Sequence, residues 1–383
     1  MVSWCKELVT LIHGLYGSDK GVELHEPVLG ARELKYVKEA IDENNVSSAG
    51  EYNQIFERKL GELTKSPFVV TTTNGTSALH IGLLLAGVRS NDCVITQSFN
   101  FVAGCNAISY CGASPIFVDI ERKTLGMCPE KLEQFLGNYT VQKDDGTCWT
   151  KGSNKRIKAC IAVHTNGHPN RVDAIHKICE MFNIDLVEDA AGALGSYFKG
   201  KHVGIIGKVG ILSFNGNKVV TAGGGGALLI SDPVLANQAR HLSTTAKINI
   251  QWDNDHDVIG YNYRLPSINA ALACGQMDNI EEILKIKREI SDTYQMFCEA
   301  YEIDYMKEPE HALSNYWLNS IILDDRKQRD QLLDYLQARG ISARAAWRPM
   351  HRTKIYSGAD AGPLITTESY SERIINLPSS MPE

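Results

Sequence analysis

The chain has 383 residues, of which 43% are hydrophobic and 22% charged, and its net charge is −6. This composition is typical of a globular protein with a large core, and it disfavours a disordered chain or a strongly basic nucleic-acid-binding protein. No apolar run is long enough to cross a bilayer, and no secretory segment is visible. The ten cysteines include no Cys-x-x-Cys pair, so we expect reduced thiols in a cytoplasmic protein.

The first fifty residues predict an arm that leads into the main domain. Residues 1–16 have the mixed spacing of a short amphipathic helix, and residues 32–44 predict a second helix, because Leu34, Val37 and Ile41 recur at helical spacing. Small polar residues at 46–52 indicate a loop, after which a helix resumes at 53–63. Such an arm either packs passively on the core or forms one wall of a pocket.

A strand, a turn and a helix are predicted over residues 68–85. The turn reads Thr-Thr-Thr-Asn-Gly-Thr-Ser at residues 71–77. Free backbone N–H groups and the positive end of a helix would point outward there, which suits a phosphate. The GxxxxGK pattern is absent, so a cofactor phosphate fits better than a nucleotide. Ordinary helix capping by Thr73 or Asn74 explains the same residues equally well.

Strands and helices alternate over the next hundred residues. Strands are predicted at 93–97, 114–119 and 158–164, with helices opening at 98–103 and at 172–182, which favours a mostly parallel sheet with helices on both faces. Phe101 lies at a strand-to-helix turn, where it stacks on a bound ring or packs in the core. His164 and His168 have no acidic third ligand nearby in the sequence, so we expect no metal site.

Residues 184–196 read Ile-Asp-Leu-Val-Glu-Asp-Ala-Ala-Gly-Ala-Leu-Gly-Ser and predict a buried strand that ends at Asp189. Open α/β sheets place ligand-binding groups at the carboxyl ends of their strands. A carboxylate there can meet a protonated ring nitrogen, and the small residues after it leave space for a flat ring. Taken alone, such an aspartate is more often a helix cap.

Lys218 stands between an apolar run at 209–214 and four consecutive glycines at 223–226. A lysine in a dry pocket loses proton affinity and can form a Schiff base with an aldehyde. The plain alternative is a solvated lysine in a flexible turn. Together, Lys218 and Asp189 favour pyridoxal 5′-phosphate as cofactor, because that cofactor needs a lysine for its aldehyde and an acid for its ring nitrogen.

The alternation is interrupted at residues 259–266. A long helical segment over 268–301, strands at 317–323 and 341–347 and a helix at 329–338 then predict a small α+β domain. We therefore expect an N-terminal arm at 1–50, a large cofactor-binding domain at 51–262, and a small C-terminal domain at 263–383 that includes the linking helix.

Four motifs taken together resemble the DegT/DnrJ-type sugar aminotransferases, which are fold type I pyridoxal phosphate enzymes. The motifs are Asn74-Gly75-Thr76, Glu188-Asp189-Ala190-Ala191, Ser213-Phe214 with Lys218 four residues later, and Gly260-Tyr261-Asn262-Tyr263-Arg264. The resemblance runs from about Leu29 to the C-terminus. It implies an α/β fold in which a large domain has a mostly parallel, seven-stranded type of sheet between helices, followed by a smaller α+β domain.

The resemblance also implies a role for each site residue. Lys218 would carry the cofactor and move protons, and Asp189 would bind the pyridine nitrogen. The ring would lie between Phe101 and Ala191, and the phosphate would be held by Gly75, Thr76 and Ser213. Asn262 would reach the phosphate of the neighbouring subunit's cofactor, which implies a homodimer with shared active sites.

One position departs from the family pattern. Many members have Gln or His where this chain has Gly192, and that side chain contacts the cofactor's 3-hydroxyl. We expect water, Asn215 or His164 to take its place, or the cofactor to be tuned differently. Tyr263, Arg264 and His351 are candidates for contacts with the sugar or the donor.

Within the family, residues 46–48, 164–169 and 213–218 are most similar to aminotransferases of the legionaminic acid and bacillosamine pathways. Those enzymes act on UDP- or GDP-linked 4-keto-6-deoxy-N-acetylhexosamines. The implied reaction moves an amino group from an amino acid, expected to be L-glutamate, to C4 of such a sugar, for a surface glycan or nonulosonic acid. The alternatives are a pyridoxal phosphate-dependent sugar dehydratase and a non-catalytic sugar-nucleotide sensor; a dinucleotide-binding dehydrogenase would need the GxGxxG fingerprint, which is absent.

Overall fold

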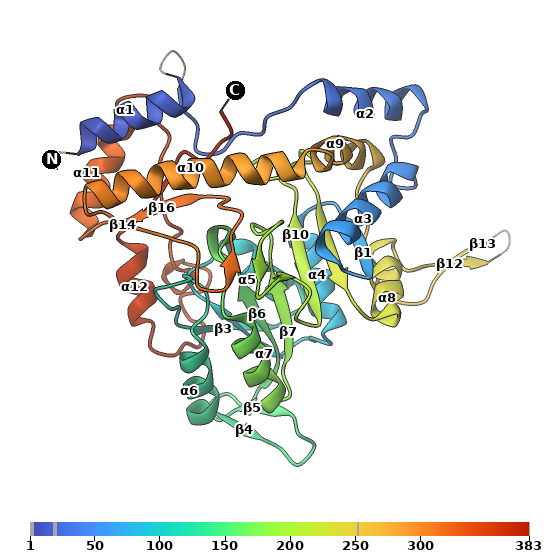
Figure 1. The fold of residues 1–383 in the computed structure, drawn as a ribbon. Coiled ribbons are helices and arrows are strands. Elements are labelled where there is room, and N and C mark those ends of the chain that lie inside the picture. Colours follow the sequence, from blue (N-terminus) through green and yellow to red (C-terminus); the bar gives the residue numbers. More distant parts are fainter. Residues whose placement is uncertain (1–3, 18–20, 251–252, 383) are drawn as a thin grey trace.

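The computed structural model describes residues 4–17, 21–250 and 253–382. A large part is built around a central sheet, and a smaller part holds the C-terminal strands (Figure 1). The long helix α10 (Ile280–Ala300) runs along both parts. Among the described residues, no helix is long and apolar enough to cross a membrane. No disulfide joins any of the ten cysteines, all of which the structure describes.

The central sheet confirms the predicted α/β fold. Its seven main strands lie in the order β1-β11-β10-β7-β6-β2-β3. Their bounds are β1 Phe68–Thr72, β11 Gly226–Ile230, β10 Val209–Ser213, β7 Asp185–Asp189, β6 Arg156–Val163, β2 Cys93–Gln97 and β3 Ser114–Val118. Strand β11 is antiparallel to both of its neighbours, and the pairs from β10 through β3 are parallel. A hairpin of β4 (Thr140–Gln142) and β5 (Cys148–Thr150) extends the sheet beside β6.

Alternating side chains bury both faces of this sheet. On β6, Ile161 belongs to one buried cluster, while the neighbouring Cys160 and Ala162 belong to the other, as the two-residue period of a strand requires. Helices α4 (Gly75–Leu85), α5 (Val102–Tyr110) and α8 (Pro233–Ser243) cover the first face. Helices α3 (Glu51–Thr64), α6 (Pro129–Tyr139), α7 (Val172–Met181) and α9 (Ser267–Met277) cover the second. The sheet is therefore enclosed, as expected of parallel strands.

The C-terminal part contains a four-stranded antiparallel sheet in the order β14-β16-β18-β17. Its elements are β14 (Asp304–Tyr305), β16 (Asn319–Ile322), β17 (Arg344–Ala345), β18 (Ile374–Leu377), α11 (Arg326–Gln337) and α12 (Ile365–Ser371). Helix α1 (Cys5–Tyr16) buries Leu8 and Ile12 in the same cluster as this sheet, so the start of the arm packs on the C-terminal part. The amphipathic helix expected at 1–16 is present from Cys5, while residues 1–3 lie outside the described chain. The three-part domain division remains a prediction.

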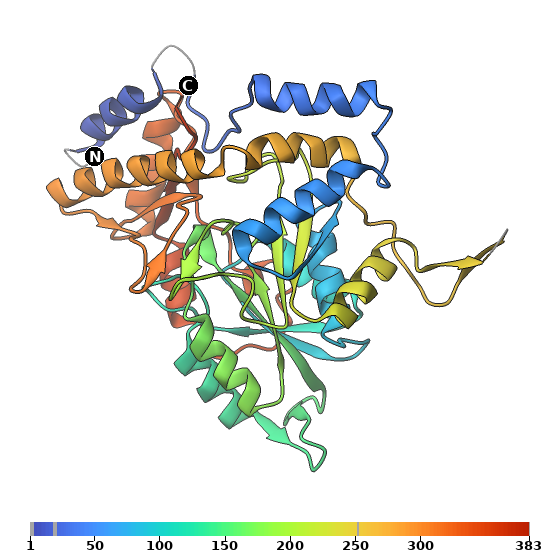
Figure 2. The ribbon, with the colours of Figure 1, turned by 45° about the vertical axis from the view of Figure 1, so that its right-hand side comes forward.

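The predicted helical segment at 268–301 is two helices. Helix α9 ends at Met277 and α10 begins at Ile280, with Asn279 outside helical geometry between them. The Asp278 carboxylate at this break accepts hydrogen bonds from Lys59 and from the Tyr36 hydroxyl. The arm helix α2 (Ala31–Asp42) lies along α9 (Figure 2). The break therefore turns the chain where the arm helices dock.

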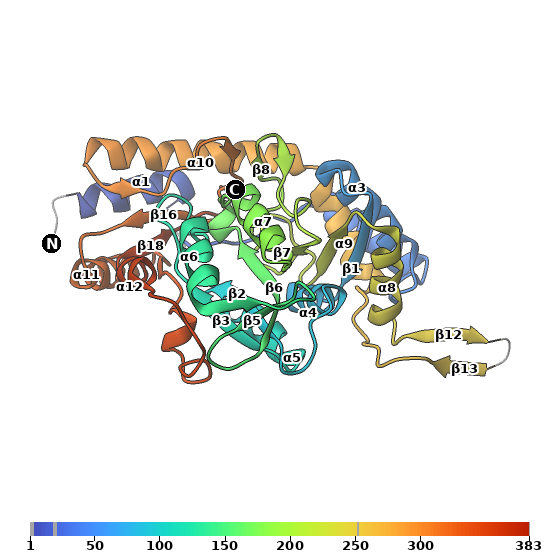
Figure 3. The same ribbon diagram turned by 90° about the horizontal axis from the view of Figure 1, so that it is seen from below.

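Some short elements had no counterpart in the sequence predictions. A hairpin of β12 (Lys247–Ile250) and β13 (Asp253–His256) extends away from the rest of the chain (Figures 1 and 3). A small sheet joins β8 (Tyr197–Phe198), β9 (Lys201–His202) and β15 (Ala312–Leu313), and short 3₁₀ helices lie at Thr165–Gly167 and Met350–Arg352. The β12–β13 hairpin alternates too few apolar residues to be recognised as a pair of buried strands.

Candidate active site

The carboxyl ends of the parallel strands bring the predicted site residues to one edge of the sheet. Asp189 ends β7 and pairs with Val163 of β6 and Ile211 of β10. Ser213 ends β10 and pairs with Gly226, and Gly226 in turn pairs with Thr72 at the end of β1. Residues from four separate stretches of sequence therefore meet here, at the edge where open α/β sheets bind ligands.

A cradle for an anion lies where β1 leads into α4. Asn74 caps the helix by accepting a hydrogen bond from the Ser77 amide at 2.8 Å. The amides of Gly75 and Thr76 and the hydroxyls of Thr76 and Ser213 have no hydrogen-bond partner within the described chain. A Cβ added at Gly75 would lie 3.0 Å from the Cβ of Ser213, so the strand end and the helix start are in contact. These donors at a helix N-terminus suit a phosphate.

The glycine run after Lys218 serves this close contact. A Cβ at Gly226 would lie 2.5 Å from the backbone of Asn74 and 2.7 Å from the amide nitrogen of Gly75. Gly223 has φ +72°, a left-handed conformation that favours glycine. The close approach at Gly226 is thus to the protein's own backbone at the helix start.

Asp189 is 7% exposed and accepts a hydrogen bond from the Ala191 amide at 3.1 Å through Oδ1. Burial raises the pKa of its carboxyl, while the Ala191 amide and the nearby Lys218 act in the opposite direction. A protonated ring nitrogen beside it would supply the missing counter-charge. The position therefore suits the role predicted for it.

The residue before it, Glu188, is fully buried and anchors the strand end. Its carboxylate accepts hydrogen bonds from the amides of Gly204, Ile206 and Gly207 at 2.8, 2.6 and 2.6 Å. It also lies 3.1 Å from Nε2 of His164. Although burial alone would raise it, the pKa of Glu188 is lowered by these partners. Glu188 therefore stays charged and fixes the loop at 204–207 against β7.

Lys218 is half-buried, and its ammonium lies 3.4 Å from the centroid of the Trp317 ring. Burial lowers the pKa of Lys218 to about 7, and the charge of Asp189 opposes that change only in part. An amine with such a pKa is largely available as a nucleophile near neutral pH. The interpretation of Lys218 as a solvated turn residue is therefore wrong.

Trp317 explains why residue 192 is glycine. A Cβ at Gly192 would lie 2.4 Å from Cε3 of the Trp317 indole, so any side chain there would displace the ring. The two residues that we considered as substitutes for the absent Gln or His are bonded to other groups. His164 is held by Glu188 and by the Asn170 amide. Asn215 is exposed and donates to the Asn217 side chain at 3.1 Å.

Two further ionisable residues near the site were not identified from the sequence. Lys287 of α10 is 1% exposed, burial lowers its pKa to about 7, and it donates to the carbonyls of Trp317 and Ser379. Both ring nitrogens of His25, on the arm, are buried without a hydrogen-bond partner. Burial, with the charges of Lys287 and Lys218, holds the pKa of His25 well below its usual value. No local motif marks residues that reach a site from such distant segments.

The other predicted residues occupy varied positions. Phe101 caps α5 and is 57% exposed, so it does not pack in the core, and stacking on a ring remains its predicted role. Ala191 is half-buried beside Asp189 and Asn262 is exposed.

The Tyr263 carbonyl accepts a hydrogen bond from Thr73 at 2.8 Å. His351 lies 2.7 Å from the Ser98 hydroxyl through Nδ1, which places it near the loop that carries Phe101.

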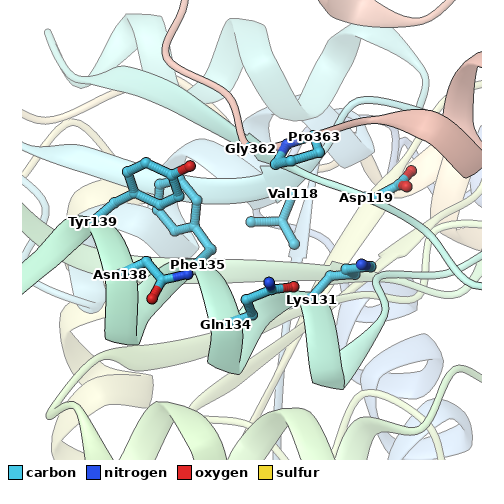
Figure 4. A pocket seen from close by; sticks show the side chains of 9 residues that line it. All are labelled: Val118, Asp119, Lys131, Gln134, Phe135, Asn138, Tyr139, Gly362 and Pro363. Atoms are coloured by element: carbon cyan, nitrogen blue, oxygen red, sulfur yellow. The ribbon is translucent and has the colours of Figure 1, made fainter.

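Two other features carry no comparable chemistry. A cavity of about 40 Å³ between β3 and α6 is too small for a cofactor (Figure 4), and the Asp119 carboxylate at its rim accepts the amides of Thr366 and Thr367. Glu121, Cys128 and Glu130 gather at one point, but Arg171 already binds both glutamates. His168, of the pair considered for a metal, is held by Ser314.

The donor set at the sheet edge fits pyridoxal phosphate. The cradle has amide and hydroxyl donors for a phosphate, Lys218 offers an amine with a lowered pKa, and Asp189 offers a buried carboxylate for a ring nitrogen. A flat ring needs room beside Ala191, and the two residues after it are small. Each group that the cofactor requires is thus available from this chain.

Comparisons with known proteins point in the same direction. Residues 27–382 match the DegT/DnrJ/EryC1/StrS aminotransferase family. A GDP-perosamine synthase of Escherichia coli O157:H7 is 34% identical over 94% of this chain and 93% of its own length. A GDP-perosamine synthase of Vibrio cholerae is 32% identical over 94% of each chain. The crystal structure of a DegT/DnrJ/EryC1/StrS aminotransferase from Brucella abortus superposes with a TM-score of 0.82 at 28% identity, covering 91% of this chain and 90% of that one.

We expect the substitution Glu188→Gln to destabilise the protein by about 3 kcal/mol in urea unfolding at pH 7, because the NH2 group that replaces one carboxylate oxygen cannot accept the buried N–H groups that this oxygen binds, and the charge that strengthens the other bonds is lost. The pKa of Glu188 is lowered in the folded state, so its stabilisation is present above its ordinary pKa and is lost as the pH falls through the folded-state value. The difference between the variant and the wild type should therefore shrink in acid.

Asp185→Asn is the matched control on the same strand. Asp185 pairs with Lys158 and Lys208 at a partly exposed site, so we expect a cost of about 0–1 kcal/mol. An equal loss of unfolding free energy in the two variants would contradict a special role for Glu188.

We also expect Lys218 in the cofactor-free protein to react with acetic anhydride with a midpoint near pH 7, since its pKa is lowered to about 7. The amine is protonated and inert below that pH and reactive above it, whereas exposed lysines react with midpoints above about 10. Peptide mass spectrometry over a pH series measures each lysine separately. A midpoint for Lys218 equal to that of the exposed lysines would contradict its burial.

Proposed function

The chain belongs to the DegT/DnrJ/EryC1/StrS aminotransferase family, and from that premise we propose that it transfers an amino group from L-glutamate to C4 of a nucleotide-linked 4-keto-6-deoxy sugar. The observation that carries the proposal is the lowered pKa of Lys218, held beside Asp189 at the ligand-binding edge of the sheet. The sugar class that we favour is a UDP- or GDP-linked 4-keto-6-deoxy-N-acetylhexosamine. The product would be a 4-amino sugar for a surface glycan or a nonulosonic acid.

The enzyme uses pyridoxal 5′-phosphate, which when bound supplies the electron sink for the carbanion at the donor's Cα. We assign its phosphate to Gly75, Thr76 and Ser213, whose free donors support this role. Asp189 would hold the ring nitrogen, and Ala191 and Phe101 would cover the two faces of the ring. The exposure of Phe101 leaves its aromatic face available for that purpose.

Lys218 has two tasks in this proposal. Its amine would hold the cofactor through the aldehyde, with loss of water, and once a donor amino acid has taken its place the freed amine would accept the proton from the donor Cα and return it to the cofactor. A pKa of about 7 suits both directions, because the amine can accept and release a proton near neutral pH. In the second half-reaction Lys218 would move the proton in the opposite sense, towards C4 of the keto sugar.

A nucleotide-linked substrate is supported by the cationic surface near the site. A cavity of about 370 Å³ is lined by Arg326, Arg329, Arg348 and Arg352. Arg329 and Arg352 form ion pairs with Asp330 and Glu372, while Arg348 has no ion pair within the described residues. Arg348 is three residues from His351, which bonds Ser98 beside the Phe101 loop. A free guanidinium in that place suits the diphosphate of a sugar nucleotide.

We further propose a homodimer in which Asn262 of one subunit completes the phosphate site of the other. Asn262 is exposed, and its side chain has no hydrogen-bond partner within the described chain. The nearby β12–β13 hairpin extends away from its own subunit (Figure 3) and exposes Ile248 and Ile250. An exposed apolar pair on a projecting hairpin favours contact with a second copy.

We expect the enzyme with pyridoxal phosphate to show an absorbance change on addition of L-glutamate, and the keto sugar to reverse it. Lys218→Ala should fold, yet lower kcat by about 10⁴-fold or more, because it removes the group that moves the proton. Lys208→Ala is the matched control, since Lys208 pairs with Asp185 at the opposite end of β10, and it should keep near-wild-type turnover. Near-wild-type turnover by Lys218→Ala would contradict this assignment.

Hybrid dimers test the shared site. We expect Lys218→Ala and Asn262→Ala to be inactive or impaired separately, and their mixture after subunit exchange to recover about a quarter of wild-type activity, because half of the dimers contain one intact site. A mixture of Lys218→Ala with Asp189→Asn is the control and should recover nothing, since both residues belong to the same subunit's site. Recovery in the control, or its absence with Asn262→Ala, would contradict the proposal.

A further inference from the structure

Trp317 is in direct contact with Lys218. Its indole ring lies under the Lys218 ammonium, 3.4 Å from the ring centroid to Nζ. The tryptophan is 6% exposed and belongs to the segment before β16, far in sequence from the other site residues. A cation over the face of tryptophan is attracted by the ring quadrupole, and the attraction is largest where water is excluded.

Trp317 is fixed through both its backbone and its ring. Its backbone N–H donates to Oδ1 of Asn315 at 2.9 Å, and its carbonyl accepts from Lys287 at 3.0 Å. Its ring N–H donates to the carbonyl of Asn217 at 2.6 Å. Its edge fills the space where Gly192 lacks a side chain. The ring is therefore a fixed surface against which the flexible lysine is placed.

The same contacts join the two loops that carry the chemistry. Asn315 donates to the carbonyls of Gly192 and Leu194 at 3.0 and 2.8 Å, and so ties the turn after Asp189 to the Trp317 segment. The bond from the indole to Asn217 ties the residue before Lys218 to the same segment. Trp317 and its neighbour thus connect the lysine loop with the aspartate loop.

We propose that Trp317 is a positioning residue for Lys218, holding the amine by its ring face and the lysine backbone by its indole N–H, and that Gly192 is required to admit it. The proposal rests on the proposed function in treating Lys218 as the reactive amine. It accounts for the glycine at 192 by the indole, which occupies the space that a side chain there would need. Trp317 touches the lysine and is therefore poised to set how readily that amine gives up its proton.

Two other titratable groups, Asp189 and His25, interact electrostatically with Lys218, and only Asp189 shifts its pKa. Asp189 favours the ammonium form. His25 has a pKa well below its usual value, chiefly through burial and also through the charges of Lys287 and Lys218, so it is neutral at pH 7 and adds no charge. With Asp189 and His25 unchanged, removing the ring face while keeping an apolar side chain should make the ammonium less stable.

The test is the pH series of acetic anhydride labelling at Lys218 in the cofactor-free protein. Trp317→Leu should lower the Lys218 pKa by about one unit, which makes labelling at pH 6 about fivefold faster. Trp317→Phe keeps a ring face but not the indole N–H, and it should lower the Lys218 pKa by about half a unit or less. Trp347→Leu is the matched control, because Trp347 lies 6.5 Å from Trp317 and has no ring contact with Lys218, and it should leave the Lys218 pKa unchanged.

A Lys218 pKa in Trp317→Leu that is equal to or above the wild-type value would overturn the proposal, because the indole would then serve only to exclude water. An equal shift of the Lys218 pKa in the control variant Trp347→Leu would also overturn the proposal. If Trp317→Leu does not fold, the phenylalanine variant decides, and an unchanged or raised pKa contradicts the proposal. Labelling needs neither cofactor nor substrate, so its outcome is separate from that of the glutamate experiment.

Discussion

The burial of one amine is the constraint on which the rest of this site depends. Lys218 lies against an indole face rather than against a carboxylate, and burial lowers its pKa to about 7. A direct ion pair with Asp189 would have kept the lysine charged and unreactive. The fold instead reserves Asp189 for a ligand and leaves the amine only partly compensated, which is the condition that a nucleophilic lysine requires.

The surrounding structure holds Lys218 and Asp189 in fixed positions. Parallel strands place Asp189 and Ser213 at one edge, and Glu188, buried immediately before Asp189, fixes the strand end through three loop amides. Segments from the C-terminal part then close the site, since Trp317 and Asn315 bond both reactive loops. The site is thus built by both parts of the chain, and the long helix α10 contributes Lys287 beneath Trp317.

Local patterns were sufficient for the central sheet and for the residues that follow its strands. The strand at 93–97 and the ends of β7 and β10 were predicted from apolar runs, and Asp189 and Lys218 were found because each follows such a run. The sequence did not reveal Trp317, His25 or Lys287, because they reach the site through tertiary packing from segments with no motif of their own. The helix break at Asn279 was also missed, since helical periodicity continues across it. The domain division and the substrate are not decided by these patterns.

The assignment of Lys218 as the cofactor-binding lysine is tested most directly by reducing the enzyme with borohydride in the presence of pyridoxal phosphate. The modified peptide is then mapped by mass spectrometry. Two buried lysines of lowered pKa, Lys218 and Lys287, compete for the assignment. We expect the cofactor's mass on Lys218 alone, since Lys287 donates to two backbone carbonyls. A cofactor attached to Lys287 or to a surface lysine, or no attachment at all, would contradict it.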